Sequence, residues 1–134
     1  MLITINGFSQ NLTCDDFTQG IFTITTPQFP GVEWKIIKTK KNQIETLSKI
    51  PQKYIDMGMP LDTLYTKIER VDNCTFRFIY DETKMKLDTY LKSMNDGGGV
   101  WVEIEKIEEK CFYYVSKSII ENKELIIKGK ICKE

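Results

Sequence analysis

The chain has 134 residues, with 19 basic and 19 acidic side chains, so its length indicates a single domain, residues 1–134, and its charge gives no general attraction to nucleic acid or anionic membranes. It contains no histidine, which excludes Ser-His-Asp and Cys-His catalysis within the chain and metal sites built on imidazole. No apolar run approaches the roughly 20 residues that span a bilayer, so no membrane partner is expected.

Residues 1–41 are predicted to form N-terminal strands. A first strand is expected over residues 2–6, where apolar and polar side chains alternate. Residues 20–26 are rich in β-branched and aromatic side chains, and residues 32–40 resume an extended pattern after a Pro-Gly turn. The first residues lack the basic segment and long apolar stretch of a signal peptide, which predicts a cytoplasmic location.

Residues 42–70 are predicted to be helical. Ile44, Leu47 and Ile50 are spaced as on one face of a helix, and Pro51 breaks or restarts it. A second apolar pattern of helical spacing follows Pro60, a residue that suits the first turn of a helix.

A strand is predicted over residues 74–80 and a helix over residues 82–95. Asp81 is a suitable N-cap for this helix, because a carboxylate oxygen accepts hydrogen bonds from the free amides of the first turn. The three glycines after Asp96 are expected to end it, since glycine adopts the left-handed conformation at low cost.

Residues 100–132 are predicted to form a three-stranded β-meander. The first hairpin is given a two-residue turn that pairs Glu108 with Cys111. The second is given a three-residue loop, because the two-residue alternative would place Lys128 opposite Lys117, and like charges directly opposed are unfavourable.

This register gives the meander one apolar and one polar face. The expected fold class is therefore α+β, an antiparallel sheet with one face covered by helices. The apolar face is expected to contain Val100, Val102, Ile104, Val115, Ile119, Ile127 and Ile131.

The polar face is the predicted functional surface. Aromatic side chains among mixed charges are typical of protein interfaces, where tryptophan and tyrosine are enriched. No arrangement of side chains makes a convincing catalytic group, so the chain is predicted to be a non-catalytic protein-binding module without cofactor or metal. The predicted partner-binding residues are Trp101, Glu103, Glu105, Tyr114, Ser116, Ser118, Lys128 and Lys130.

The most concrete functional hypothesis is a small inhibitor or immunity-type protein of phage or mobile-element origin that acts on a bacterial defence or toxin protein. One alternative is a nucleic-acid-binding accessory protein, in which Trp34, Lys38 and Lys40 share one face of a strand. The other is a phage structural or assembly subunit, a homo-oligomer that associates through an exposed strand edge.

The four cysteines at positions 14, 74, 111 and 132 allow two disulfides in any of three connectivities. Their spacing is wide and the chain shows no secretory signal, so reduced thiols are predicted.

Overall fold

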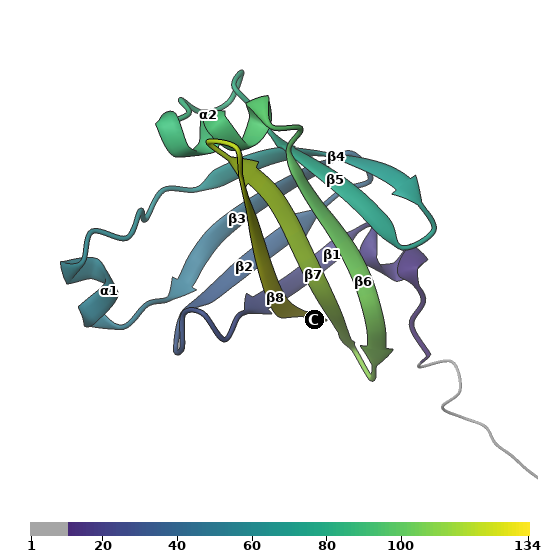
Figure 1. Ribbon diagram of the computed structural model, residues 1–134. Coiled ribbons are helices and arrows are strands. Elements are labelled where there is room, and N and C mark those ends of the chain that lie inside the picture. Colours follow the sequence, from purple (N-terminus) through teal and green to yellow (C-terminus); the bar gives the residue numbers. More distant parts are fainter. Residues whose placement is uncertain (1–10) are drawn as a thin grey trace, which may run out of the picture.

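A computed structural model describes residues 11–134, and the strand predicted over residues 2–6 lies outside them. Eight antiparallel strands follow one another in chain order and close into a barrel (Figure 1). The strands are β1 (Gly20–Thr25), β2 (Glu33–Lys38), β3 (Asn42–Lys49), β4 (Leu64–Asp72), β5 (Thr75–Tyr80), β6 (Val100–Glu108), β7 (Cys111–Ile120) and β8 (Lys123–Lys133). Pairing of β1 with β8, from Phe22 opposite Lys133 to Thr25 opposite Lys130, completes the closure.

The predicted α+β class is wrong, because the sheet buries its apolar side by closing on itself rather than under helices. The helices are short: η2 (Cys14–Phe17), α1 (Gln52–Asp56) and α2 (Thr89–Asp96). In Figure 1, α2 lies across one end of the barrel, where it contacts β5 and β7. None of the helices in the described part of the chain has the length and apolar character needed to cross a membrane.

The predicted helical segment, residues 42–70, is mostly strand. Only the short helix after Pro51 is confirmed, as α1. In β3 the side chains of Gln43 and Glu45 point into the barrel, whereas Ile44 is exposed. The polar residues thus occupy the inner positions of this strand and an apolar residue faces solvent, which is the opposite of the usual alternation in a strand that packs against a core.

The helix predicted over residues 82–95 begins later than expected. Asp81 caps no helix, because its Oδ1 accepts hydrogen bonds from the amide and the hydroxyl of Thr83. Asp88 is the N-cap instead, and its Oδ1 accepts from the amide of Leu91 at 2.8 Å. The helix ends before Gly97, as the glycine run predicts.

A bulge between Ile104 and Lys106 displaces the predicted register of β6 against β7. The expected pair Glu108–Cys111 is confirmed, but beyond the bulge Ile104 lies opposite Tyr114 instead of Val115. An extra residue on one strand shifts every later pair by one position and so exchanges the faces.

The second hairpin also differs from the expected one. Its turn is Glu121-Asn122, both with positive φ, so that Ile120 pairs with Lys123. This turn lies one residue earlier than the predicted loop, and Lys117 pairs with Ile126 rather than with a lysine. The charge conflict that favoured a longer loop therefore does not arise.

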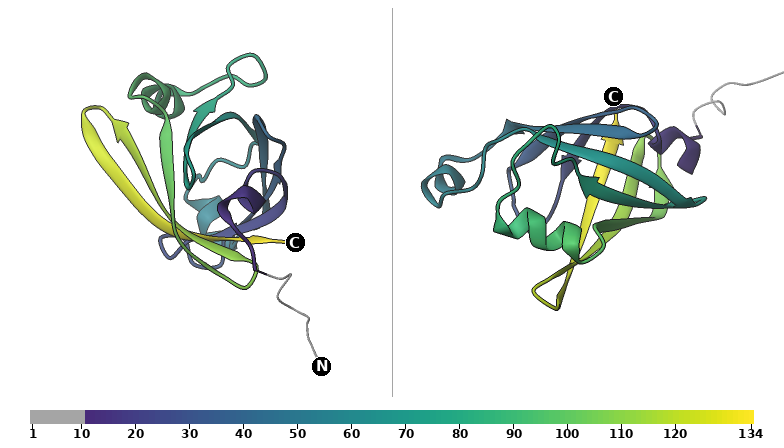
Figure 2. Two further views of the ribbon diagram at one scale, coloured as in Figure 1. Left: turned by 90° about the vertical axis from the view of Figure 1, so that its right-hand side faces the viewer. Right: turned by 90° about the horizontal axis from the view of Figure 1, so that it is seen from above.

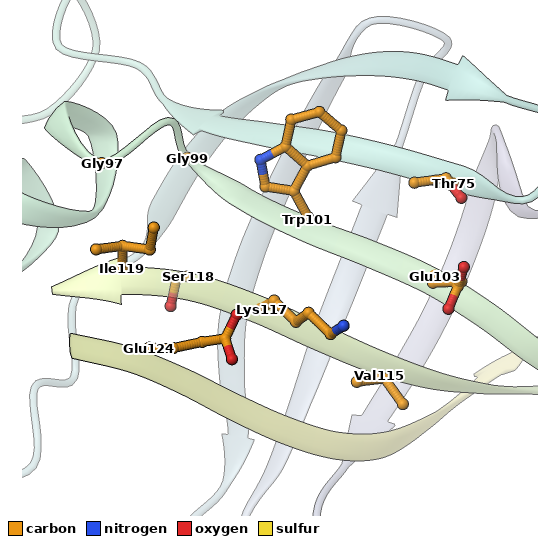
Figure 3. A pocket seen from close by; sticks show the side chains of 10 residues that line it. All are labelled: Thr75, Gly97, Gly99, Trp101, Glu103, Val115, Lys117, Ser118, Ile119 and Glu124. Carbon is orange, nitrogen blue, oxygen red and sulfur yellow. The ribbon is translucent and has the colours of Figure 1, made fainter. Parts of the chain in front are cut away.

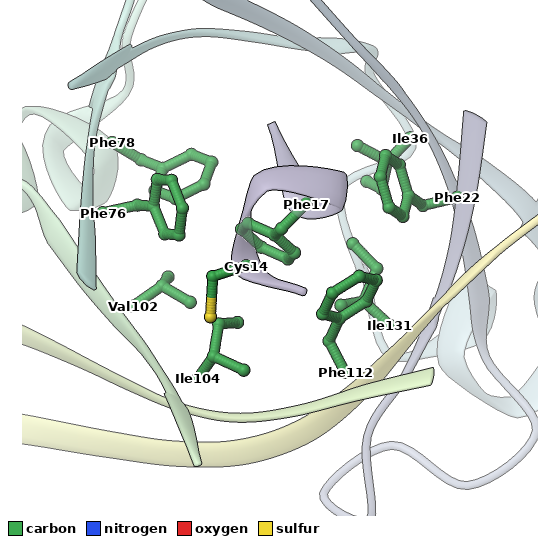
Figure 4. Packing of buried hydrophobic residues seen from close by; sticks show 10 residues of the cluster. All are labelled: Cys14, Phe17, Phe22, Ile36, Phe76, Phe78, Val102, Ile104, Phe112 and Ile131. Atoms are coloured by element: carbon green, nitrogen blue, oxygen red, sulfur yellow. The ribbon is translucent and has the colours of Figure 1, made fainter. Parts of the chain in front are cut away.

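The apolar core fills the end of the barrel that η2 closes, which we call the plugged end. Phe17 of η2 lies inside the ring of strands, with its ring centroid 4.9 Å from Phe76 and 5.3 Å from Phe112 (Figure 4). The C-terminal strand ends beside η2, where Lys133 Nζ donates to the backbone oxygen of Asp16 at 3.0 Å (Figure 2).

The prediction of reduced thiols is wrong, because all four cysteines form disulfides in this structure. Cys14–Cys74 joins η2 to the turn between β4 and β5. Cys111–Cys132 joins directly opposed residues of β7 and β8. The β7–β8 hairpin places Cys111 opposite Cys132, and the docking of η2 places Cys14 beside Cys74, so the spacing of the cysteines in the sequence does not indicate these pairs.

Candidate ligand cavity in the barrel

A row of polar side chains crosses four neighbouring strands on the inner wall of the barrel. Strand pairing places Lys38 opposite Gln43, Gln43 opposite Thr66, and Thr66 opposite Tyr80. Lys38, Gln43 and Thr66 are almost completely buried, with relative exposures of 4%, 7% and 7%. A polar belt thus lies where a barrel of this size normally packs apolar side chains.

This belt borders an internal cavity of about 140 Å³. Its polar lining comes from the belt together with Glu45, Tyr114 and Ser116. The remaining wall is apolar and consists of Phe17, Ile24, Phe78, Val100, Val102 and Ile131. A cavity of roughly 150 Å³ in another protein admits benzene, so this volume suits a molecule with one small ring.

Two buried polar atoms of the belt lack a hydrogen-bond partner within the described residues: Gln43 Oε1 and Thr66 Oγ1. Burial without a partner costs about 1–3 kcal/mol for each such group. Both residues line the cavity, so a molecule inside it can supply the missing partner.

The ammonium group of Lys38 lies among aromatic rings. Its Nζ is 3.9 Å from the ring centroid of Phe17 and 4.7 Å from that of Phe78. Among residues 11–134, neither a hydrogen bond nor an ion pair within 4 Å engages this group. The ring faces attract a cation, but they accept none of the three N–H bonds in the usual way.

Lys38 and Glu45 form a separated pair of opposite charges on adjacent strands. Burial lowers the pKa of Lys38 from its ordinary 10.5 to about 7, and attraction to Glu45 opposes only part of this effect. Burial likewise raises the pKa of Glu45 to about 7, against the opposing attraction to Lys38. Glu45 keeps some accessible surface because it faces the cavity. Near neutral pH the pair can therefore gain or lose protons at little cost.

Two tyrosines complete the titratable lining. Burial, followed by the nearby charge of Glu45, raises the pKa of both Tyr80 and Tyr114 well above the ordinary value of 10. Both phenols therefore stay protonated at neutral pH and can donate a hydrogen bond into the cavity.

A second cavity, of about 300 Å³, adjoins the first at the plugged end. Phe17 and Lys38 line both cavities, and the outer one also touches the exposed side chains of Lys40 and Arg70. Asp15 already pairs with Arg70, at 2.7 Å. Lys38 therefore lies between a basic opening and the interior of the barrel.

The residues of the predicted partner-binding face do not share one face. Tyr114 and Ser116 line the internal cavity, and Ser118 is buried. Trp101 and Glu103 point outward, where they border a groove of about 310 Å³ with Lys117, Ile119 and Glu124 (Figure 3). Glu105 lies at the bulge, and Lys128 and Lys130 pair with Val115 and Tyr113 on the outer side of β7.

The basic patch of the nucleic-acid alternative does not exist as a surface. Lys38 is buried, Trp34 packs against the core, and only Lys40 of the three is exposed. Sequence reasoning did place Trp34 and Lys38 on the same side of one strand, but it assigned that side to solvent.

Sequence reasoning missed the polar belt itself. Gln43, Glu45 and Thr66 lie within residues 42–70, where the spacing of apolar side chains predicts helix instead of strand. In the first half of Asn42–Lys49 (NQIETLSK), Gln43 and Glu45 point inward and Ile44 points outward, so the alternation is present but places polar side chains on the inner side.

The fold and cavity together define a closed, up-and-down, eight-stranded barrel with a small chamber, whose largely apolar wall carries a belt of polar side chains. Comparisons of the chain with protein-family models, curated proteins and solved structures find no match.

Proposed function

We propose that this protein binds a small organic molecule with a hydrogen-bonding group inside the barrel. The observation that carries this proposal is the pair of buried, unpartnered atoms, Gln43 Oε1 and Thr66 Oγ1, at the cavity wall. Apolar side chains opposite them would hold a ring or short chain, and the polar belt would orient its polar end.

The test compares benzyl alcohol with toluene, which has the same ring but no hydroxyl group. We expect benzyl alcohol to bind more tightly, and to shift the amide resonances of β3 and β4 in NMR spectra. Thr66→Val should weaken benzyl alcohol binding severalfold and leave toluene binding nearly unchanged. Trp101→Ala, on the outer groove, is the matched control and should affect neither.

Absence of binding by either probe at millimolar concentration would overturn the proposal and leave a chamber that holds water only. Resonance shifts confined to the outer groove would overturn it as well, because the ligand would then lie elsewhere.

Binding of a protein partner is a second candidate function, supported by one surface observation. Trp101 keeps 40% of its surface exposed at the outer groove, beside Ile119 with 44%. A buried tryptophan anchor commonly contributes 2 kcal/mol or more to an interface. Trp101→Ala should therefore weaken capture of a partner at least tenfold, whereas Met57→Ala, which removes another exposed side chain, should not. An inhibitor of a defence or toxin protein remains one prediction within this class.

We also propose that the protein resides in an oxidising compartment. Two disulfides support residence under oxidising conditions, in place of the cytoplasm that the first residues predict. Thiol alkylation of the freshly isolated, denatured protein should leave all four cysteines unmodified until a reductant is added. Alkylation without reductant would favour the cytoplasm.

A further inference from the structure

We propose that Lys38 captures the carbonyl group of a small aldehyde in the barrel cavity and holds it as an imine. This inference rests on the proposed function, since the same cavity holds the ligand. It adds a chemical class of ligand and a covalent site.

The surroundings of the Lys38 amine favour its neutral form. Lys38 is 96% shielded from solvent, with a relative exposure of 4%, and it faces two cavities. Its ammonium form would hold three N–H donors without an acceptor within hydrogen-bond distance among residues 11–134. A neutral amine loses less on burial, and it carries the lone pair that attacks a carbonyl carbon.

The carboxyl group of Glu45 lies near the Lys38 amine and can serve as its proton donor. Glu45 lies diagonally across from Lys38 on β3, since its own strand partner is Ile36. Burial raises the pKa of Glu45 to about 7, so a large fraction of this carboxyl group keeps its proton at neutral pH. At neutral pH an amine and a carboxylic acid, each partly uncharged, thus face one small chamber.

The reaction balances with these two groups and the aldehyde. The Nζ lone pair attacks the carbonyl carbon, and one N–H proton passes to the oxygen to give a carbinolamine. The proton of Glu45 then leaves with the hydroxyl group as water, while nitrogen forms the double bond to carbon. The products are a protonated imine, a carboxylate opposite it and one water molecule, so the net charge of the chamber is unchanged.

Other titratable groups around the amine favour this outcome. Tyr80 and Tyr114 remain neutral, and they can donate hydrogen bonds to the carboxylate that forms. Lys40 and Arg70 line the outer cavity, and Arg70 is paired with Asp15 at 2.7 Å.

The test uses benzaldehyde with sodium cyanoborohydride, which reduces an imine to a stable benzylamine. At pH 7 we expect a single benzyl group to be added first, located at Lys38 by peptide mass spectrometry. Its rate should exceed that at the exposed Lys35 and Lys41 by about tenfold or more, because Lys38 lines the chamber that would hold the aldehyde beside it and the exposed lysines do not. Glu45→Gln should slow labelling of Lys38 severalfold and leave that of Lys35 unchanged.

Equal labelling of Lys38 and the exposed lysines in the folded protein would overturn the inference, as would no labelling of Lys38. Benzyl alcohol separates the two proposals, because it fits the chamber but forms no imine. If benzyl alcohol binds and Lys38 stays unlabelled, only the covalent inference fails. If benzyl alcohol also fails to bind, the proposed function fails with it.

Discussion

At the scale of single residues, the polar belt costs stability. The hydroxyl of Thr66 is buried without a partner among residues 11–134, whereas that of Thr83 donates to Asp81 Oδ1 at 2.6 Å. Thr66→Val should therefore raise the free energy of unfolding by about 1 kcal/mol, because it removes an unpaired polar group at nearly constant shape. Thr83→Val should lower it by about 1 kcal/mol. Denaturant unfolding of both variants measures the difference in sign, and a destabilised Thr66→Val protein would show that its hydroxyl has a partner.

The Lys38–Glu45 pair predicts an unusual dependence of stability on pH. Glu45 binds its proton more tightly in the folded state, so its contribution to stability is lost as pH rises from 4.5 to about 7. Lys38 loses its proton more readily in the folded state, so its contribution grows as pH rises from about 7 to 10.5. Together they predict a minimum of stability near pH 7, with slopes of at most about 1.4 kcal/mol per pH unit for each group.

Denaturant unfolding across this pH range measures the profile. The double variant Lys38→Met/Glu45→Gln is the matched comparison, because it removes both titrations and keeps the side-chain lengths similar. Subtracting its profile from that of the natural protein should leave the minimum near pH 7. A flat difference would mean that neither pKa is displaced.

At the scale of elements, most of the strands were predictable and most of their partners were not. The β-branched and aromatic runs of β1, β2 and β5 identify strands from local sequence. β3 was not predicted because its inner positions carry glutamine and glutamate. These polar residues line the cavity instead of packing in an apolar core. The bulge at Glu105 has no glycine or proline to mark it in the sequence. This single extra residue exchanges the faces of β6 relative to β7.

The plug η2 depends on its disulfide more than the barrel wall depends on the other one. Cys14–Cys74 closes a separation of 60 residues, and Cys111–Cys132 one of 21 within a ladder that hydrogen bonds already hold. Loop entropy predicts losses of about 4 kcal/mol for Cys14→Ser/Cys74→Ser and about 3 kcal/mol for Cys111→Ser/Cys132→Ser. Hydrogen exchange should accelerate around η2 only in the first variant. Equal acceleration in both would mean that the plug is held by Phe17 packing and the Asp15–Arg70 ion pair.

At the scale of the whole molecule, the cavity exists only because the chain closes. Lys38, Thr66 and Tyr114 come from β2, β4 and β7, and no short motif contains any two of them. The predicted meander and its first turn, with Glu108 opposite Cys111, are confirmed, but a closed sheet has an interior that an open meander lacks. Tyr114 and Ser116, which were predicted to lie on the surface, therefore line the cavity inside the barrel.

Closure itself can be tested with two isoleucines of β8. Ile131 is 1% exposed and lies in the core, opposite Phe112 of β7 and Ile24 of β1, whereas Ile126 points outward with 48% exposed. Ile131→Ala should cost about 2–5 kcal/mol of unfolding free energy, and Ile126→Ala less than about 1 kcal/mol. Because β8 joins both neighbours at Ile131, its replacement should also speed hydrogen exchange in β1, far away in sequence.

An open sheet in the predicted register would behave differently. β1 would not pair with β8, so the loss of Ile131 would leave exchange in β1 unchanged relative to the global change in stability. Equal costs for the two alanine variants would contradict the placement of Ile131 inside the barrel and of Ile126 on its outer surface. The cavity and the chemistry proposed for Lys38 both require the closed barrel, so these two variants test the structural feature on which both depend.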